Sequence, residues 1–318
     1  MTPPERVNEY DASCARCGGE VPAGTGLLRH GPKGWEVYHP DHAPEPGPPP
    51  RGDHPGWHRR PLLSLDIGST GHRPAVDRIR SAALRGSDGT VRDWVLDIGS
   101  DVQDFGSDIH GLGSGVQDLG SNVQDPGSGV PDIGSRSSDI GSDTQDPTAA
   151  LDELATLVAA HLAAHQLLVV WYAPHVLSTL HAELLRHDLA PLTTRLPGGV
   201  APICDPLVLD RHADRYRAGS RSLRSVAAWY GVPHAHPGDP GSDAEAALLL
   251  ADEIAARHAP LARLSRPALH TEQILWHAEQ MSRHPEAADW PFTPVQPQPW
   301  EPVPDPAPRE PVQPVQPD

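Results

Sequence analysis

A seven-residue repeat in the middle of the chain constrains the fold more than any other feature. Its units follow one another from Asp97, and DIGSDVQ, DFGSDIH and DLGSNVQ are typical. Apolar residues recur at alternating intervals of four and three, the spacing of a coiled-coil seam. However, every unit also contains a Gly-Ser pair, and glycine costs about 1 kcal/mol at a helical position. Because Pro126 and Pro131 would interrupt a helix further, the repeat predicts a disordered, low-complexity insert over residues 97–147.

Two ordered alternatives to this insert are a coiled coil and a calcium-binding solenoid. The segment has ten Asp against the single Arg136, which suits calcium, but the known solenoid motif repeats every nine residues. A flexible loop is compatible with one folded domain around it. Lengthening a loop from ~20 to ~50 residues adds only about 0.8 kcal/mol to the free energy of loop closure. We therefore expect the repeat to interrupt a single domain.

The composition indicates that ordered and disordered segments alternate. Of 318 residues, 38 are Pro and 29 are Gly, and only 37% are hydrophobic, which is too few for one compact core of this length. The net charge of -17 argues against a wide non-specific nucleic-acid surface. No apolar run approaches the ~18 residues of a membrane span, and the first residues lack the apolar stretch of a signal peptide. We expect a soluble, cytoplasmic protein with no membrane partner.

Regular secondary structure is predicted on both sides of the repeat. Strands come first, and strands then alternate with helices, which predicts an α/β domain over residues 61–260: a mixed sheet flanked by helices. A further helix is expected within residues 261–284. The predicted strands are 61–66, 78–86, 91–96, 167–171 and 200–204, and the predicted helices are 151–166, 174–187, 206–217, 221–230, 242–257 and 267–283.

Two cysteines and two histidines near the N-terminus have the spacing of a two-knuckle zinc site. Two residues separate Cys14 from Cys17, and two residues also separate His39 from His42 further on. His30 is a possible substitute ligand. Few other apolar residues are present to order this segment, which favours a structural metal. The alternative is a reduced cysteine pair beside unrelated histidines, of which the chain has 19.

Proline-rich stretches mark the remaining boundaries. Residues 1–45 form the zinc-knuckle-like segment, and residues 46–60 are predicted to be a linker. Residues 285–318, with repeated PVQP, predict an extended or disordered tail. Such a tail is a possible ligand for the groove of a protein partner, although a passive tail is the simpler interpretation.

The stretch from Leu62 to Leu84 is the first candidate for chemistry. It reads as an apolar strand ending in Asp66, a Gly-rich turn, and a second strand. A carboxylate at that place would either hold a metal ion or close the turn.

The sequence Asp66-Ile-Gly-Ser-Thr-Gly resembles the first motif of the DEDDh 3'-5' exonucleases, which is Asp-x-Glu-Thr-Thr-Gly. This is the family of the proofreading subunit of bacterial DNA polymerase III and of ribonuclease T. The resemblance covers residues 60–96 and 148–260 and is strongest over Ile203–Val232. It implies a ribonuclease H-like fold and hydrolysis of DNA or RNA 3' ends. In this family four carboxylates hold two magnesium or manganese ions, and a histidine activates water.

Three of the five catalytic positions that the resemblance implies are substituted. Asp66 and Asp243 retain two of the carboxylates. Gly68 stands in place of the glutamate, Val176 in place of the aspartate of the second motif, and Gly238 in place of the histidine. Two carboxylates cannot balance two divalent ions in a partly desolvated cleft. We therefore expect Asp66 and Asp243 to bind at most one magnesium or manganese ion, and weakly.

Asp243 and the histidines near it have other interpretations. Ser242-Asp-Ala-Glu245 is a helix capping box, which needs no metal. His234 and His236 lie close in sequence to the lost histidine and would replace it only if one reached the attacking water.

Five arginines between residues 211 and 224 suggest contacts with phosphate. Arg215, Arg217 and Arg221 are the candidate nucleic-acid-binding residues. Asp210 and Asp214 partly neutralise them, so a solvated helix face is the alternative interpretation.

Two functional hypotheses follow. The first is an exonuclease-domain protein with impaired catalysis, which at most binds DNA or RNA 3' ends. The second is a non-catalytic protein-interaction module that uses the zinc knuckle, the repeat and the Pro-rich tail.

Overall fold

The computed structural model describes residues 7–31, 34–44, 47–98, 144–215, 217, 219–282 and 289–299, without the side chains of residues 30, 31 and 34. The seven-residue repeat lies outside the described residues except at its two ends. The prediction of a disordered insert therefore stays a prediction, as do its coiled-coil and solenoid alternatives.

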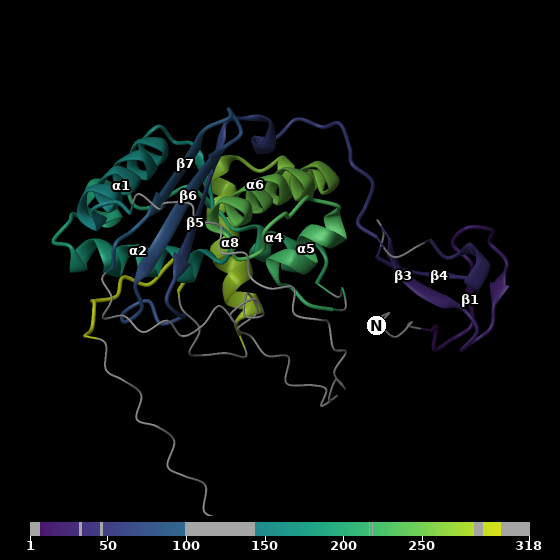
Figure 1. Cartoon of the computed structure of the whole chain (residues 1–318). Coiled ribbons are helices and arrows are strands. Elements are labelled where there is room, and N and C mark those ends of the chain that lie inside the picture. Colours follow the sequence, from purple (N-terminus) through teal and green to yellow (C-terminus); the bar gives the residue numbers. More distant parts are fainter. Residues whose placement is uncertain are drawn as a thin grey trace, which may run out of the picture.

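A five-stranded mixed sheet forms the centre of the fold (Figure 1). Its strands are β5 (Leu62–Ser69), β6 (Ile79–Gly86), β7 (Val91–Val95), β8 (Leu167–Val169) and β9 (Ile203–Cys204), in the order β7-β6-β5-β8-β9. β5, β6 and β7 are antiparallel neighbours, whereas β8 runs parallel to β5, and β9 runs parallel to β8. The predicted mixed sheet is confirmed.

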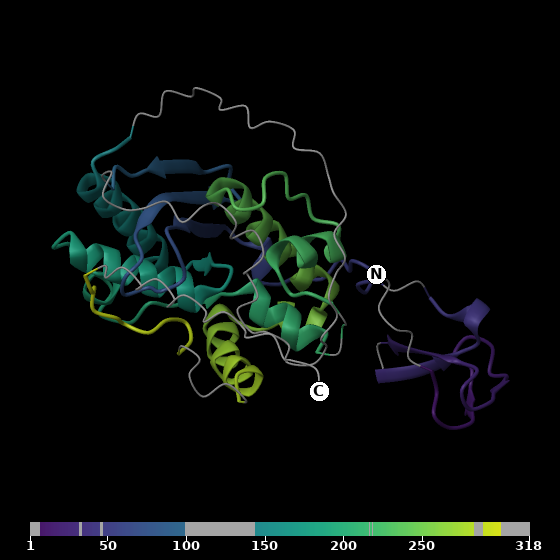
Figure 2. The same cartoon turned by 60° about the horizontal axis from the view of Figure 1, so that its bottom comes forward.

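Helices cover both faces of the sheet (Figures 1 and 2). One core cluster joins one face of β5 to α1 and α2, and a second joins the other face to α4, α5 and α6. The helices are α1 (Pro147–Ala163), α2 (Ala173–Arg186), α3 (Leu192–Arg195), α4 (Pro206–Ala213), α5 (Leu223–Tyr230), α6 (Pro240–Arg257), α7 (Ala259–Ala262) and α8 (Arg266–Gln280).

Alternation along β5 determines which side chains face α6. Leu63, Leu65 and Ile67 belong to the cluster with α1 and α2. Leu62 belongs to the opposite cluster. Because successive side chains of a strand point to opposite faces, Asp66 lies on the α6 face with Leu62.

The two ends of the insert meet beside the sheet. Leu96 pairs with Gln145 in an isolated parallel bridge, and the Gln145 amide donates to the Val95 carbonyl at 2.8 Å. Asp146 then caps α1 by accepting from the Ala149 amide at 2.9 Å. The chain therefore leaves and re-enters the domain at one place, as an interrupted single domain requires.

The N-terminal segment forms two small hairpins, which the sequence patterns did not predict. β1 (Ala12–Ser13) pairs with β2 (Glu20–Val21), and β3 (Leu27–Gly31) pairs with β4 (Gly34–Tyr38). A short 3-10 turn, η1 (Pro40–His42), follows.

Much of the predicted linker is attached to the domain, in contrast to a free linker. The Gly52 amide donates to the Ala256 carbonyl at 2.8 Å, and Arg51 pairs with Asp252 at 2.5 Å on α6. The 3-10 turn η2 (Trp57–Arg59) then places the Trp57 side chain, 4% exposed, in the core. The reason is that burial of one large indole outweighs the flexibility that the surrounding prolines and glycines indicate.

Residues 289–299 also depart from the prediction of a disordered tail. Trp290 is buried in the cluster with α1 and α2. The Thr293 amide donates to Ser178 Oγ at 3.0 Å, and the Gln298 amide donates to the Ala75 carbonyl at 2.7 Å. This stretch has no helix or strand, so its proline content does predict its extended backbone but not its attachment.

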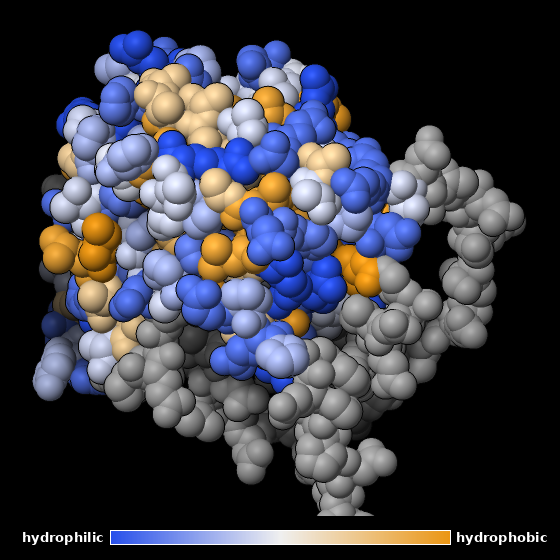
Figure 3. Space-filling model, turned by 90° about the vertical axis from the view of Figure 1, so that its left-hand side faces the viewer, coloured by the Kyte–Doolittle hydropathy of each residue, from blue (hydrophilic) through white to orange (hydrophobic). Residues whose placement is uncertain are grey.

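The face that α1 and α2 present is mostly hydrophilic, with apolar residues in small scattered groups (Figure 3). Within the described residues, no helix is both long enough and apolar enough to span a bilayer.

Candidate functional site

Asp66 lies inside β5 and not at its end. The strand continues to Ser69, and Asp66 pairs with Ala83 of β6. The prediction of a strand that ends at Asp66 is therefore wrong by three residues, because the backbone pairing with β6 continues through Gly68. The side chain is partly buried on the α6 face.

Asp239 and Asp243 reach the same region from the first turn of α6. Asp239 is the N-cap of the helix, and its carboxylate accepts from the Ser242 amide at 2.8 Å. Burial and then the negative charges of Asp243 and Asp239 raise the pKa of Asp66 well above its ordinary value. The three carboxylates therefore interact electrostatically. Asp239 directly follows Gly238, which occupies the histidine position of the third motif.

Asp243 already has a partner in the protein. His234 Nε2 lies 2.5 Å from Asp243 Oδ1, and the Gly238 amide donates to the same carboxylate at 3.1 Å. Burial raises the pKa of Asp243, and these two hydrogen bonds oppose that rise without cancelling it. His234 therefore orients the carboxylate through Nε2, whereas its Nδ1 is buried without a hydrogen-bond partner among the described residues. His236 is exposed, and its backbone amide donates to Ser242 Oγ.

Gly68 follows Asp66 by two residues in β5 and therefore lies on the same face of the sheet, toward α6. A Cβ atom at Gly68 would lie 2.5 Å from Ser81 Oγ and 3.3 Å from Pro240 Cγ. The first distance is too short for real atoms, so Ser81 would have to change rotamer to admit any side chain. Ser81 thus occupies part of the space that a side chain at position 68 would need.

The other two substituted positions are equally adapted to the residues present. Val176 on α2 is 3% exposed and belongs to the core cluster with α1. Gly238 has a φ of 91°, a backbone conformation that side chains other than glycine rarely adopt. The aspartate and the histidine that the resemblance implies at these two positions would therefore need local changes in the surrounding structure.

The candidate nucleic-acid-binding arginines are largely used within the protein. Arg217 and Arg221 both contact the fully buried carboxylate of Asp210, at 2.7 and 2.6 Å. Arg215 is exposed and pairs with Glu279 at 2.7 Å. Contact of these three with nucleic acid stays a prediction, and Arg215 has the most accessible side chain of them.

The four predicted zinc ligands come together. The ligand atoms of Cys14, Cys17, His39 and His42 all lie within 4.8 Å of one another, and among the described residues they are the group that meets this criterion. Cys14 Sγ lies 3.6 Å from His42 Nδ1, and Cys17 Sγ lies 3.5 Å from His39 Nδ1. Tetrahedral zinc with ordinary bond lengths would separate a sulfur and a nitrogen ligand by about 3.6 Å. This group could bind zinc.

The surroundings of these ligands favour the forms that bind metal. His39 Nε2 lies 3.1 Å from the Glu20 carbonyl oxygen. Because a carbonyl can only accept a hydrogen bond, Nε2 carries the proton, and Nδ1 is left free to face Cys17. Burial opposes ionisation of Cys14. Backbone amides, that of His39 above all, and the His42 side chain outweigh burial and lower the pKa of Cys14 to about 5. A thiolate is the form that ligates zinc.

No protein-family model matches the chain. A search of curated proteins also finds no significant match.

Solved structures of exonuclease I are similar to this chain. The complex of E. coli exonuclease I with a dA16 oligonucleotide shares 13% identity at a TM-score of 0.47, over 64% of this chain and 42% of that chain. A product-bound exonuclease I shares 14% identity at a TM-score of 0.46, over 70% and 48% of the two chains. The chain thus spans less than half the length of these exonuclease I chains.

Proposed function

We propose that this chain is an exonuclease-like domain protein that binds the 3' end of a DNA or RNA strand and has lost efficient hydrolysis. The observation that carries the proposal is the group of Asp66, Asp239 and Asp243 between β5 and α6. Two of these acids stand at motif positions of the DEDDh exonucleases, on a mixed sheet flanked by helices. Burial raises the pKa of Asp66 and of Asp243, and the negative charges of the neighbouring acids add to this rise.

The carboxylates fit one divalent ion better than two. Magnesium is usually held by one or two protein carboxylates together with substrate phosphates. Asp66, Asp243 and Asp239 would supply the negative charge for one magnesium or manganese ion. Gly68 and Val176 supply none for a second. An ion held in this way would neutralise a terminal phosphodiester as it binds.

The loss of hydrolysis follows from the same residues. A general base contributes about 10²–10⁴-fold to a rate, and Gly238 stands where the resemblance implies the histidine. Loss of the second ion removes stabilisation of the charge that develops on the leaving oxygen. A site of this kind retains ground-state contacts with the strand while it loses those specific to the transition state.

End binding is tested by competition between linear and circular single strands of equal length. The full chain is titrated with a labelled linear 20-mer of DNA, and then of RNA, by fluorescence anisotropy in magnesium. We expect the linear competitor to displace the label at least tenfold better than the circle. We also expect Asp66→Asn with Asp243→Asn to remove this preference. Equal competition by both strands, or no binding of either, would contradict the proposal.

We also propose that zinc occupies the Cys14, Cys17, His39 and His42 group as a structural metal. The donor set of two thiolates and two imidazoles is typical of closed structural zinc sites. Apart from Cys14, few described residues of this segment are buried: they are Asn8, Val21 and Gly26.

A further inference from the structure

A pocket of about 710 Å³ opens on the edge of the domain where its parallel strands begin. Residues that precede β5, β8 and β9 line it, among them Arg60, His165 and Pro202. The start of α8 closes the other side. Asp66 lies further along β5, and Asp205 follows the far end of β9. The pocket is therefore separate from the candidate active site.

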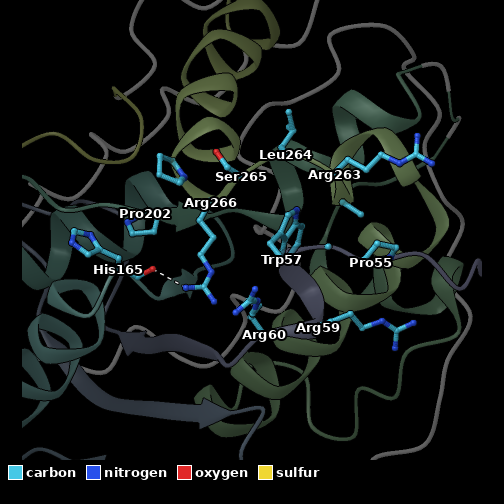
Figure 4. Close-up of a pocket in the computed structure, with 13 residues that line it drawn as sticks. Pro55, Trp57, Arg59, Arg60, His165, Pro202, Arg263, Leu264, Ser265 and Arg266 are labelled. Carbon is cyan, nitrogen blue, oxygen red and sulfur yellow. Dashed lines mark hydrogen bonds between the residues drawn. The ribbon is translucent and has the colours of Figure 1, made fainter.

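Four arginines line this pocket, and no acidic residue does. They are Arg59, Arg60, Arg263 and Arg266. Figure 4 shows the side chains of Arg60 and Arg266 extending toward the same part of the pocket. On a chain with a net charge of -17, four arginines that line one pocket without a lining carboxylate are a strong local exception.

Most of this positive charge is not used inside the protein. Arg266 donates to the His165 carbonyl at 2.8 Å, a neutral partner (Figure 4). Arg59 has a long contact of 3.4 Å with Asp53, which is fully exposed. The side chains of Arg60 and Arg263 make no hydrogen bond or ion pair with another described residue.

The two segments that carry the arginines are fixed to each other. Trp57 Nε1 donates to the Leu261 carbonyl at 3.0 Å, and the indole is buried between the segments. Gly56 comes so close to the second segment that a Cβ atom there would lie 2.4 Å from the Ala262 carbonyl oxygen. The backbone segments that carry the arginines are therefore fixed before any ligand arrives, which reduces the entropic cost of binding.

We propose that this pocket binds a small organic phosphate, a molecule with a phosphate chain of at least two negative charges and an apolar ring. Guanidinium groups bind phosphate in bidentate geometry. The N-terminus of α8 adds a favourable dipole for an anion. Pro55, Leu264 and Pro267 supply apolar walls for the ring. The volume lies in the range of small-molecule sites.

The test is calorimetric titration of the full chain with ADP and, separately, with inorganic pyrophosphate, without added divalent metal. The test variant is Arg60→Ala with Arg263→Ala, because these side chains have no described partner and their loss should not affect folding. The control variant is Arg92→Ala with Arg224→Ala, which removes the same charge from exposed positions outside the pocket. Thermal unfolding of all three proteins verifies that they fold.

We expect ADP to bind about tenfold more tightly than pyrophosphate, since only ADP reaches the apolar walls. The test variant should weaken ADP binding at least tenfold, and the control variant less than twofold. Equal weakening by both variants would show general attraction to positive charge and overturn the proposal. Failure of ADP to bind, with binding instead of an acidic peptide or a single-stranded oligonucleotide that the test variant abolishes, would also overturn it.

Discussion

Asp210 shows how one buried acid can turn arginines that the sequence suggests for phosphate binding into partners of an internal ion pair. The sequence places five arginines near it, which favours a phosphate-binding surface. In the structure Asp210 is fully buried and draws Arg217 and Arg221 to itself, and Arg217 also stacks over the Trp229 ring at 5.1 Å. Sequence spacing cannot predict this, because it does not show which acid is buried.

We predict that Asp210→Ala lowers the free energy of unfolding by about 3–5 kcal/mol, because two nearly buried guanidinium groups lose their counter-charge. Glu279→Ala is the matched control, since Glu279 also pairs with an arginine but both partners are more than half exposed. It should cost less than about 1 kcal/mol. Urea unfolding measures both values, and a similar cost for the two variants would contradict the structural role of Asp210.

Asp205 is a second buried acid with a structural task. Its carboxylate accepts from the Ala173 amide at 2.9 Å and from the Leu207 amide at 3.0 Å, so it caps the starts of α2 and α4 together. Burial raises the pKa of Asp205 to about 6, although these hydrogen bonds act in the opposite direction.

We predict that the stability of the wild-type protein relative to Asp205→Asn falls as the pH rises from about 4 to about 6. In the unfolded chain Asp205 loses its proton near pH 3.9, whereas in the folded chain it keeps it to about pH 6. Across this window the folded state binds more protons, so its stability decreases by about 3 kcal/mol and is then constant. Chemical unfolding at a series of pH values measures the difference. Parallel curves for the two proteins would contradict the raised pKa.

At the scale of elements, the large periodic segments were predictable and the small ones were not. Apolar periodicity located β5, β6, β7 and the helices α1, α2 and α6 to within a few residues. β1 and β2 have 2 residues each, and β3 and β4 have 5 each, so they are too short to give a clear periodic signal. Trp57 and Trp290 lie in proline-rich stretches whose composition hides a single buried side chain.

The candidate site was predictable only where its residues belong to a motif with a fixed spacing. Motif spacing identified Asp66, Asp243 and the four zinc-ligand candidates. The contact between His234 and Asp243 and the proximity of Asp239 depend on how the first turn of α6 meets β5. Such tertiary contacts have no sequence spacing of their own.

We predict that the purified full-length chain contains about one equivalent of zinc, and that Cys14→Ser with Cys17→Ser removes it. Without the metal, the hairpins of residues 7–44 should lose protection from amide exchange, because their few buried side chains cannot hold them together. Cys204→Ala is the control, since Cys204 is buried in the sheet domain away from this group. Zinc content unchanged by the double serine variant would contradict the assignment.

At the scale of the whole molecule, the domain closes independently of its long insert. Leu96 and Gln145 already form a bridge, so the ends of the insert are joined by the fold itself. We predict that replacing residues 99–143 with a short Gly-Ser link changes the unfolding temperature by less than about 4 °C. In a domain of this size, such a shift corresponds to a change of about 1 kcal/mol in the free energy of unfolding. A larger decrease would show that the repeat packs on the domain and would favour its ordered alternatives.

The central claim is that the exonuclease-like site binds without efficient hydrolysis, and a rate comparison tests it most directly. The full chain and its Asp66→Ala, Asp243→Ala variant, purified identically, are incubated with a 3'-labelled single strand in magnesium and in manganese. Because Gly68, Val176 and Gly238 stand where the resemblance implies two metal-binding acids and a general base, we predict the same background rate for both proteins, within about twofold. Release of label by the wild-type chain at tenfold or more above the variant would contradict the account and show that the remaining carboxylates still catalyse hydrolysis.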